Sequence, residues 1–136
     1  MPDLLVNIDV ADLESAVTFY TEGLGLRLAR RLGRDIAELR GGPCPVYLIQ
    51  HAADALPFAD APSPRDSTRH WTPVHLDFVV RDLEGAIARA EAVGAAREGA
   101  IRAFDGGRFQ VLVDPFGNGL CLLQFEGRGY AEMEGA

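Results

Sequence analysis

Two short segments of the sequence carry polar side chains at every second position, where a strand would place them on one face. Asn7 and Asp9 alternate with apolar residues in the first segment, as do His75 and Asp77 in the second. Such groups are costly to bury alone, so they either bond one another and water or contact a ligand. Because histidine titrates near neutral pH, His75 is the candidate general base, with Asp77 two residues along the same face. The alternative is that His75 is a satisfied polar residue lining the ligand site.

The composition excludes several classes of protein. All 13 basic residues are arginines, and without a lysine the chain cannot form a Schiff base with pyridoxal phosphate. The net charge of −7 and the lack of a basic patch argue against nucleic acid and favour a cationic ligand. No apolar run is long enough to cross a membrane, and the first residues lack a signal-peptide pattern. We therefore expect a cytoplasmic protein with no membrane partner.

The two cysteines, Cys44 and Cys121, do not form a Cys-x-x-Cys pair, so we expect two free thiols. Cys121 stands among leucines, and an apolar setting raises the pKa of a thiol. We therefore interpret Cys121 as an inert core residue, with a nucleophilic role as the alternative.

The sequence contains a two-copy repeat. Residues 5–17 match residues 75–87, with Asp12 and Asp82 in equivalent places 70 positions apart. In each copy an alternating strand precedes an aspartate suited to cap a helix, and apolar residues then recur at helical spacing. Gly25 and Gly94 are placed where these helices should end. The apolar face of each strand should lie against the helix that follows.

Three further strand-like runs follow each helix, so each copy is a βαβββ module. The chain has 136 residues, which fits a single domain of two such modules. We expect the first module over 3–51, a proline-rich linker or surface loop over 52–71, the second module over 72–126 and a tail over 127–136. The runs are 26–32, 35–40 and 45–50 in the first module and 96–103, 108–113 and 119–125 in the second.

Three stretches resemble the vicinal oxygen chelate superfamily, which includes glyoxalase I, bleomycin-resistance proteins and extradiol dioxygenases. They are Val-Ala-Asp-Leu-Glu-Ser-Ala-Val-Thr-Phe-Tyr (10–20), Val-Val-Arg-Asp-Leu-Glu-Gly-Ala (79–86) and Asp-Pro-Phe-Gly-Asn-Gly-Leu-Cys-Leu-Leu (114–123). The resemblance implies an α+β fold in which two βαβββ modules form curved mixed sheets around a central cleft. It does not specify the reaction, because one fold hosts many chemistries.

The resemblance also implies four positions for the donors of a divalent metal, at the first and last strands of each module. These positions hold Leu5, Tyr47, His75 and Cys121, without a carboxylate. Hard ions such as Mg²⁺ and Mn²⁺ prefer oxygen donors, so we expect no metal cofactor. If Zn²⁺, Ni²⁺, Mn²⁺ or Fe²⁺ were bound, its donors would be His75 and Cys121, fewer than a tight site needs.

The predicted function is therefore binding of a small organic molecule in the cleft, without the usual metal. The first alternative is a lyase related to glyoxalase I, or another metalloenzyme of the superfamily. A dioxygenase is disfavoured because it needs two histidines and a carboxylate, and an interaction module without turnover is the last alternative. Whether the chain is an enzyme stays open, and the resemblance implies a homodimer. We expect the cleft to be lined by Asn7, Asp9, Tyr47, His75, Asp77 and Cys121.

Overall fold

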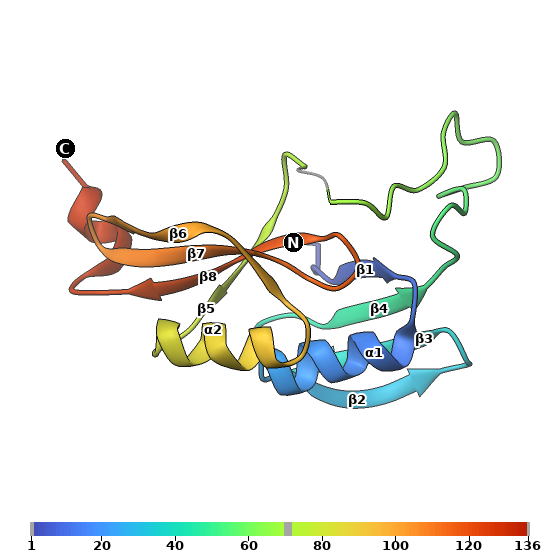
Figure 1. Cartoon of the computed structure of the whole chain (residues 1–136), viewed down its shortest axis with the longest axis horizontal. Coiled ribbons are helices and arrows are strands. Elements are labelled where there is room, and N and C mark those ends of the chain that lie inside the picture. Colours follow the sequence, from blue (N-terminus) through green and yellow to red (C-terminus); the bar gives the residue numbers. More distant parts are fainter. Residues whose placement is uncertain (1, 70–71, 136) are drawn as a thin grey trace. The chain divides into compact units, whose positions relative to one another are not determined.

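The computed structural model describes residues 2–69 and 72–135 of the chain. The chain divides into two compact units, Met1–Thr68 and Arg69–Ala136, and the boundary falls inside the predicted connecting segment. Each unit holds one four-stranded mixed sheet and one α-helix that follows the first strand (Figure 1). The predicted α+β class and the two βαβββ modules are therefore confirmed.

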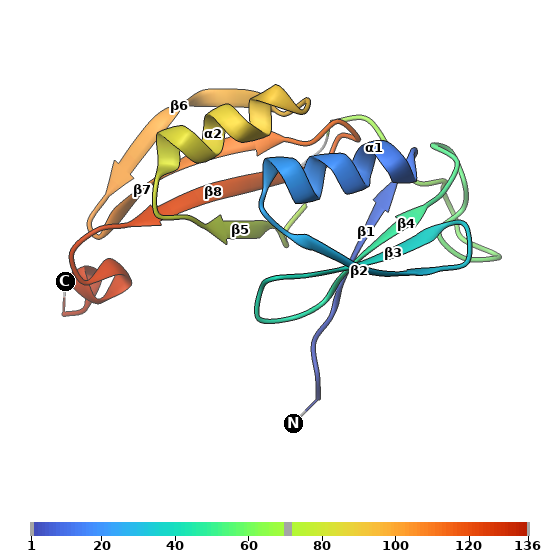
Figure 2. The same cartoon turned by 90° about the horizontal axis from the view of Figure 1, so that it is seen from below.

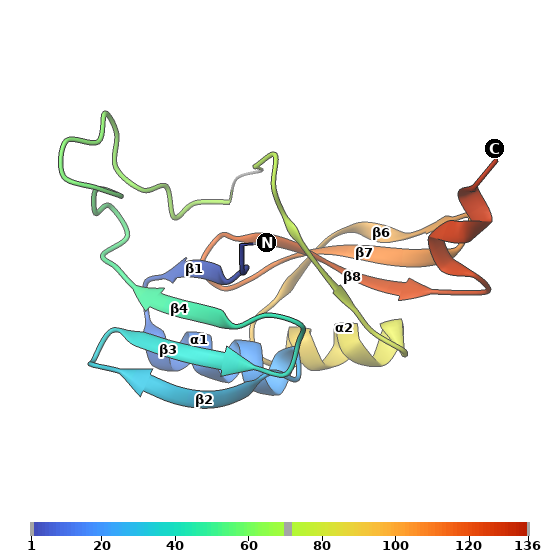
Figure 3. The ribbon, with the colours of Figure 1, turned by 180° about the vertical axis from the view of Figure 1, so that it is seen from behind.

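Unit 1 has the strand order β1-β4-β3-β2, in which β1 runs parallel to β4 and the other neighbours are antiparallel. Figures 2 and 3 show α1 on one face of this sheet and no helix of unit 1 on the other. The elements are β1 (Val6–Val10), α1 (Leu13–Thr18), β2 (Arg27–Leu32), β3 (Ile36–Arg40) and β4 (Val46–Gln50).

Unit 2 repeats this arrangement, with the order β5-β8-β7-β6 and β5 parallel to β8. Figure 2 shows α2 in front of its sheet, and the opposite face again has no α-helix of the same unit. The elements are β5 (Leu76–Val79), α2 (Leu83–Ala92), β6 (Ala96–Phe104), β7 (Gly107–Val113) and β8 (Gly119–Phe125), followed by a short 3₁₀ helix (Gly129–Met133).

The same capping hydrogen bonds stabilise the N-terminus of the helix in both units. The side chain of Asp12 accepts a hydrogen bond from an amide of the first turn of α1, and Asp82 does the same for α2. A glutamine at the end of the last strand adds a second bond, because Gln50 accepts from the amide of Leu13 at 2.8 Å. Gln124 accepts from the first amide of α2, also at 2.8 Å. The internal repeat therefore extends to the end of the last strand.

The alternating pattern of the sequence sets which face of each sheet is buried. Ile8 and Val10 are buried under α1, whereas Asn7 and Asp9, which alternate with them, are exposed. The helix-covered face of unit 1 also buries Leu39 and Leu48 completely, and in unit 2 the corresponding residues of β7 and β8 are Leu112 and Leu122. Each unit thus has its own apolar core between one helix and one sheet face.

The first helix departs from the prediction. The apolar spacing predicted regular α-helix up to Leu24, but the α-helix ends at Thr18 and continues as a π-helical turn over Phe19–Gly23. Phe19 and Tyr20 are neighbours in sequence and both fully buried, with their rings edge to face at 4.9 Å. Adjacent side chains on a regular helix point in different directions. The wider π-helical turn allows both Phe19 and Tyr20 to be buried. Gly25 follows with a φ of +80°, as the predicted helix end requires.

The connecting segment has no helix or strand between His51 and the boundary at Thr68, in agreement with the predicted loop. It is nevertheless attached to unit 1, because Arg65 donates from Nε to Asp9 at 2.7 Å and from a terminal nitrogen to the carbonyl of Leu56. Trp71, at the end of the predicted linker, lies outside the described residues.

The tail folds back on its own unit. Tyr130 packs edge to face on Phe125 at 4.8 Å and lies 5.8 Å from the ring of Phe104, both in strands of unit 2. Within the described residues, none of the helices is long and apolar enough to span a bilayer.

Candidate functional site

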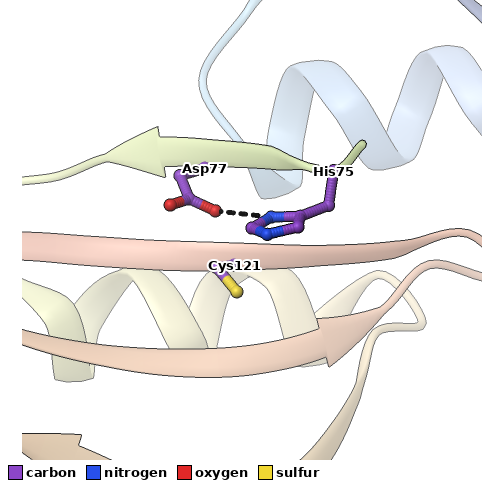
Figure 4. A group of neighbouring side chains, drawn as sticks. All are labelled: His75, Asp77 and Cys121. Carbon is purple, nitrogen blue, oxygen red and sulfur yellow. Dashed lines mark hydrogen bonds and ion pairs between the residues drawn. The ribbon is translucent and has the colours of Figure 1, made fainter. Parts of the chain in front are cut away.

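In unit 2, the predicted site residues meet on the helix-free face of the sheet. His75 stands just before β5, Asp77 lies on β5, and Cys121 is the direct neighbour of Asp77 on β8 (Figure 4). The Nδ1 atom of His75 lies 3.0 Å from a carboxylate oxygen of Asp77. One donor atom from each of the three residues lies within 4.8 Å of the others. The sequence placed His75 and Asp77 on one face, and the structure brings them into direct contact.

The thiol of Cys121 is held in its neutral form. Burial, together with the negative charge and hydrogen bond of Asp77, raises the pKa of Cys121 to about 11. The side chain is only 7% exposed, whereas those of His75 and Asp77 are 43% and 35% exposed. Since the thiolate is the nucleophile and the metal-binding form, this raised pKa disfavours both a nucleophilic and a metal-binding role for Cys121 at neutral pH.

In unit 1, the remaining predicted residues also lie on the helix-free face. Tyr47 on β4 is the direct neighbour of Asn7 on β1, as Cys121 is of Asp77 in unit 2. This register confirms that Tyr47 is the counterpart of Cys121. Asp9 lies further along β1, where it pairs with Arg65 of the connecting segment and lies 3.5 Å from His51.

Sequence reasoning missed a charged cluster around Tyr47. Glu38 on β3 has a side chain only 5% exposed, yet it lies on the helix-free face beside Tyr47. The Tyr47 hydroxyl donates to its carboxylate at 2.5 Å, and Arg30 and Arg40 donate at 3.1 and 3.4 Å. The hydroxyl and the two guanidinium groups hold the pKa of Glu38 below its usual value, against the effect of burial. In the sequence, the feature that could have indicated this cluster is that Glu38 stands between two apolar residues of one predicted strand.

A second missed pair lies on the corresponding face of unit 2. Arg69 forms a two-point ion pair with Glu98 on β6, with both nitrogen–oxygen distances at 2.6 Å. Its guanidinium lies over Gly119, where a Cβ atom would come within 2.7–2.9 Å of it. A Cβ atom at the start of β8 would therefore have to displace the end of the Arg69 side chain. The phrase Asp-Pro-Phe-Gly-Asn-Gly predicted the turn but not this contact.

The donor set does not fit the oxygen-rich metal centre that the resemblance implies. Leu5 offers no donor atom, the Tyr47 hydroxyl is bonded to Glu38, and Cys121 carries a neutral thiol. Asp77 adds a carboxylate that the sequence had not counted, so unit 2 offers one nitrogen, one oxygen and one sulfur. That set suits a softer ion such as Zn²⁺ better than Mg²⁺ or Mn²⁺.

Comparison with known proteins decides the family. The model of the glyoxalase-like domain matches residues 5–123, which include both helices and all eight strands except the end of the last. The chain belongs to the glyoxalase-like family. It is therefore a member of the vicinal oxygen chelate superfamily, as its three sequence motifs indicated. No curated protein matches the chain.

Solved structures of other glyoxalase-like proteins share the fold. A glyoxalase-related enzyme from Fulvimarina pelagi superposes with a TM-score of 0.72 and 19% identity, over 90% of this chain and 87% of that one. A fosfomycin resistance protein from Listeria monocytogenes gives 0.69 and 15%, over 93% and 94%. A lactoylglutathione lyase from Agrobacterium tumefaciens gives 0.62 and 19%, over 99% and 97%. At these identities the likeness establishes the fold and not the reaction.

Proposed function

We propose that this glyoxalase-like protein binds a small organic molecule on the helix-free faces of its sheets, without the divalent metal used by related enzymes. The observation that carries the proposal is Cys121, a buried and neutral thiol at the position where the metal enzymes carry glutamate. The first-strand donor position, which holds His75 in unit 2, holds Leu5 in unit 1, and leucine cannot bind a metal. Half-exposed polar groups are what a ligand would use for orientation.

In this proposal His75 contacts a ligand that is bound on the helix-free face of unit 2. The carboxylate of Asp77 lies 3.0 Å from Nδ1 and fixes the orientation of the imidazole. A histidine oriented by a carboxylate is suited to accept a proton from a bound molecule, so His75 is the general base if the ligand is turned over.

Metal content after loading tests the proposal. The purified protein is incubated with Zn²⁺, Ni²⁺, Mn²⁺ and Fe²⁺, desalted and measured by elemental analysis, in parallel with His75→Ala. We expect neither protein to retain metal, and a ligand screen by thermal shift to give stoichiometric binding without product. Near-stoichiometric metal in the wild type that is lost in His75→Ala would overturn the proposal.

The second candidate is a metal-dependent lyase or related enzyme, and the cluster of His75, Asp77 and Cys121 favours it. Three different donor atoms within 4.8 Å of one another could hold Zn²⁺ with an open position. Retention of Zn²⁺ by the wild type that is lost in Cys121→Ser would support this candidate, because the sulfur is one of the three donor atoms. A homodimer and a cytoplasmic location stay predictions, and sedimentation of the purified chain tests the first.

A further inference from the structure

The helix-free face of unit 1 is positively charged although the chain as a whole is acidic. Arg30 lies directly opposite Glu38 in the sheet, and Arg27 lies directly opposite Arg40. Arg40 and Glu38 are two residues apart on β3 and so point to the same side. Three guanidinium groups therefore lie on the same side of the sheet as Glu38, and those of Arg30 and Arg40 contact its carboxylate, in a chain whose net charge is −7.

The carboxylate orients the arginines without using all their hydrogen-bond donors. Glu38 is buried beneath them and accepts from Arg30 and Arg40, whose own side chains are 61% and 47% exposed. Each guanidinium has five N–H groups, and these contacts occupy two nitrogens of Arg30 and one of Arg40. Arg27 forms no ion pair with any residue in the described part of unit 1. Glu38 therefore orients Arg30 and Arg40, whose remaining donors reach the surface and can bind a planar oxyanion.

A pocket adjoins this arginine group. It has a volume of about 590 Å³, within the range of small-molecule sites. Arg40 forms part of its wall, so one side chain belongs to both the pocket and the charged cluster. Most of the remaining wall is apolar, and Asp3 contributes the one carboxylate. The lining residues are Asp3, Leu4, Leu5, Arg40, Pro43, Cys44 and Pro45.

We propose that unit 1 binds a small organic acid whose oxyanion group contacts Arg27, Arg30 and Arg40, while its apolar body lies in the adjoining pocket. This inference rests on the proposed function and specifies its ligand class. It reverses the expectation of a cationic ligand, which followed from net charge alone. The charges close to the site determine the preferred charge of the ligand, because at physiological salt exposed charges more than about 8 Å apart are largely screened.

Four naphthalene probes test the sign of the preferred charge. Calorimetry and thermal shift are run with 1-naphthoate, 1-naphthyl phosphate, neutral 1-naphthylmethanol and cationic 1-naphthylmethylamine. We expect at least one of the two anions to bind about tenfold more tightly than the alcohol, and the amine to bind more weakly still. Tighter binding of 1-naphthoate would indicate a carboxylate ligand, and tighter binding of 1-naphthyl phosphate would indicate a phosphate ester. The affinity for the anion should fall as the salt concentration rises.

Arg40→Gln and Arg97→Gln form a matched pair of variants. Both arginines are about half exposed, and each makes one weak ion pair, to Glu38 at 3.4 Å and to Glu91 at 3.2 Å. Arg40→Gln should weaken binding of the better anion about tenfold, whereas Arg97→Gln in unit 2 should leave that affinity unchanged.

The outcomes separate this inference from the function on which it rests. If the alcohol or the amine binds as tightly as both anions, the inference is wrong and small-molecule binding still stands. Equal losses in the two variants would also overturn it, because they would reflect net charge and not this site. If none of the four probes binds, the inference fails, and the broader ligand screen then decides the proposed function.

Discussion

Cys121 should react far more slowly with alkylating reagents than an ordinary thiol. With Cys44 replaced by serine, Cys121 is the single thiol of the chain, and its pKa of about 11 leaves about one molecule in a thousand as thiolate at pH 8. A free thiol with a pKa of about 8.5 is about one quarter thiolate at that pH. The higher pKa also makes the thiolate intrinsically more nucleophilic, by about tenfold. The net effect is a rate about twentyfold lower, before the shielding by burial.

The assay is reaction of this variant with iodoacetamide, followed by mass spectrometry and compared with an unstructured peptide that carries one internal cysteine, at the same pH. The rate should increase about tenfold per pH unit up to about pH 10. Asp77→Asn should accelerate the reaction in part, because it removes the negative charge but leaves the burial, which is the larger cause. A rate at pH 8 equal to that of the peptide would refute the reasoning and make Cys121 a candidate nucleophile or metal ligand.

Four further substitutions test the fold. Gln50→Ala and Gln124→Ala should each cost about 1 kcal/mol of unfolding free energy, because each leaves the first amide of a helix without its acceptor, and urea denaturation of both variants checks this. The pKa of Glu84 is lowered to about 2 by its ion pair, so the unfolded state binds more protons between about pH 4.5 and 2 and stability falls as pH falls. In Glu84→Gln, the fall in stability between about pH 4.5 and 2 should be smaller than in the wild type, as measured by acid titration followed by circular dichroism. Gly106→Ala should expose the tail to trypsin, because φ is +107° and a Cβ would collide with the carbonyl of Gly129; unchanged proteolysis would contradict this.

Most of the fold follows from local patterns in the sequence. The run 119–125 predicted β8 at its observed limits, Gly119–Phe125, and the other strands agree within one or two residues. These patterns succeed because a sheet with one covered face requires alternation, and because a helix end requires a cap or a glycine. The π-helical turn was missed because it depends on burying Phe19 and Tyr20 together, which the spacing of apolar residues does not encode.

The candidate site was predictable where it depends on a single strand. His75 and Asp77 are two residues apart, so any strand places them on one face, and the repeat identified the counterpart in unit 1. The arginine group was not predictable, because its members come from β2 and β3 and their meeting depends on register. A bulge between Leu28 and Arg30 shifts the pairing so that Arg30 lies opposite Glu38.

By itself the sequence determined the class of fold, the family, the two repeated modules and the replacement of the expected metal donors at Leu5 and Cys121. These features are encoded in residue type and short-range spacing. Only the tertiary structure decided that Glu38 is buried beneath arginines and that Cys121 is the direct neighbour of Asp77. Both depend on strand pairing between segments far apart in the chain, and the environment that this pairing creates sets the charge state of each group.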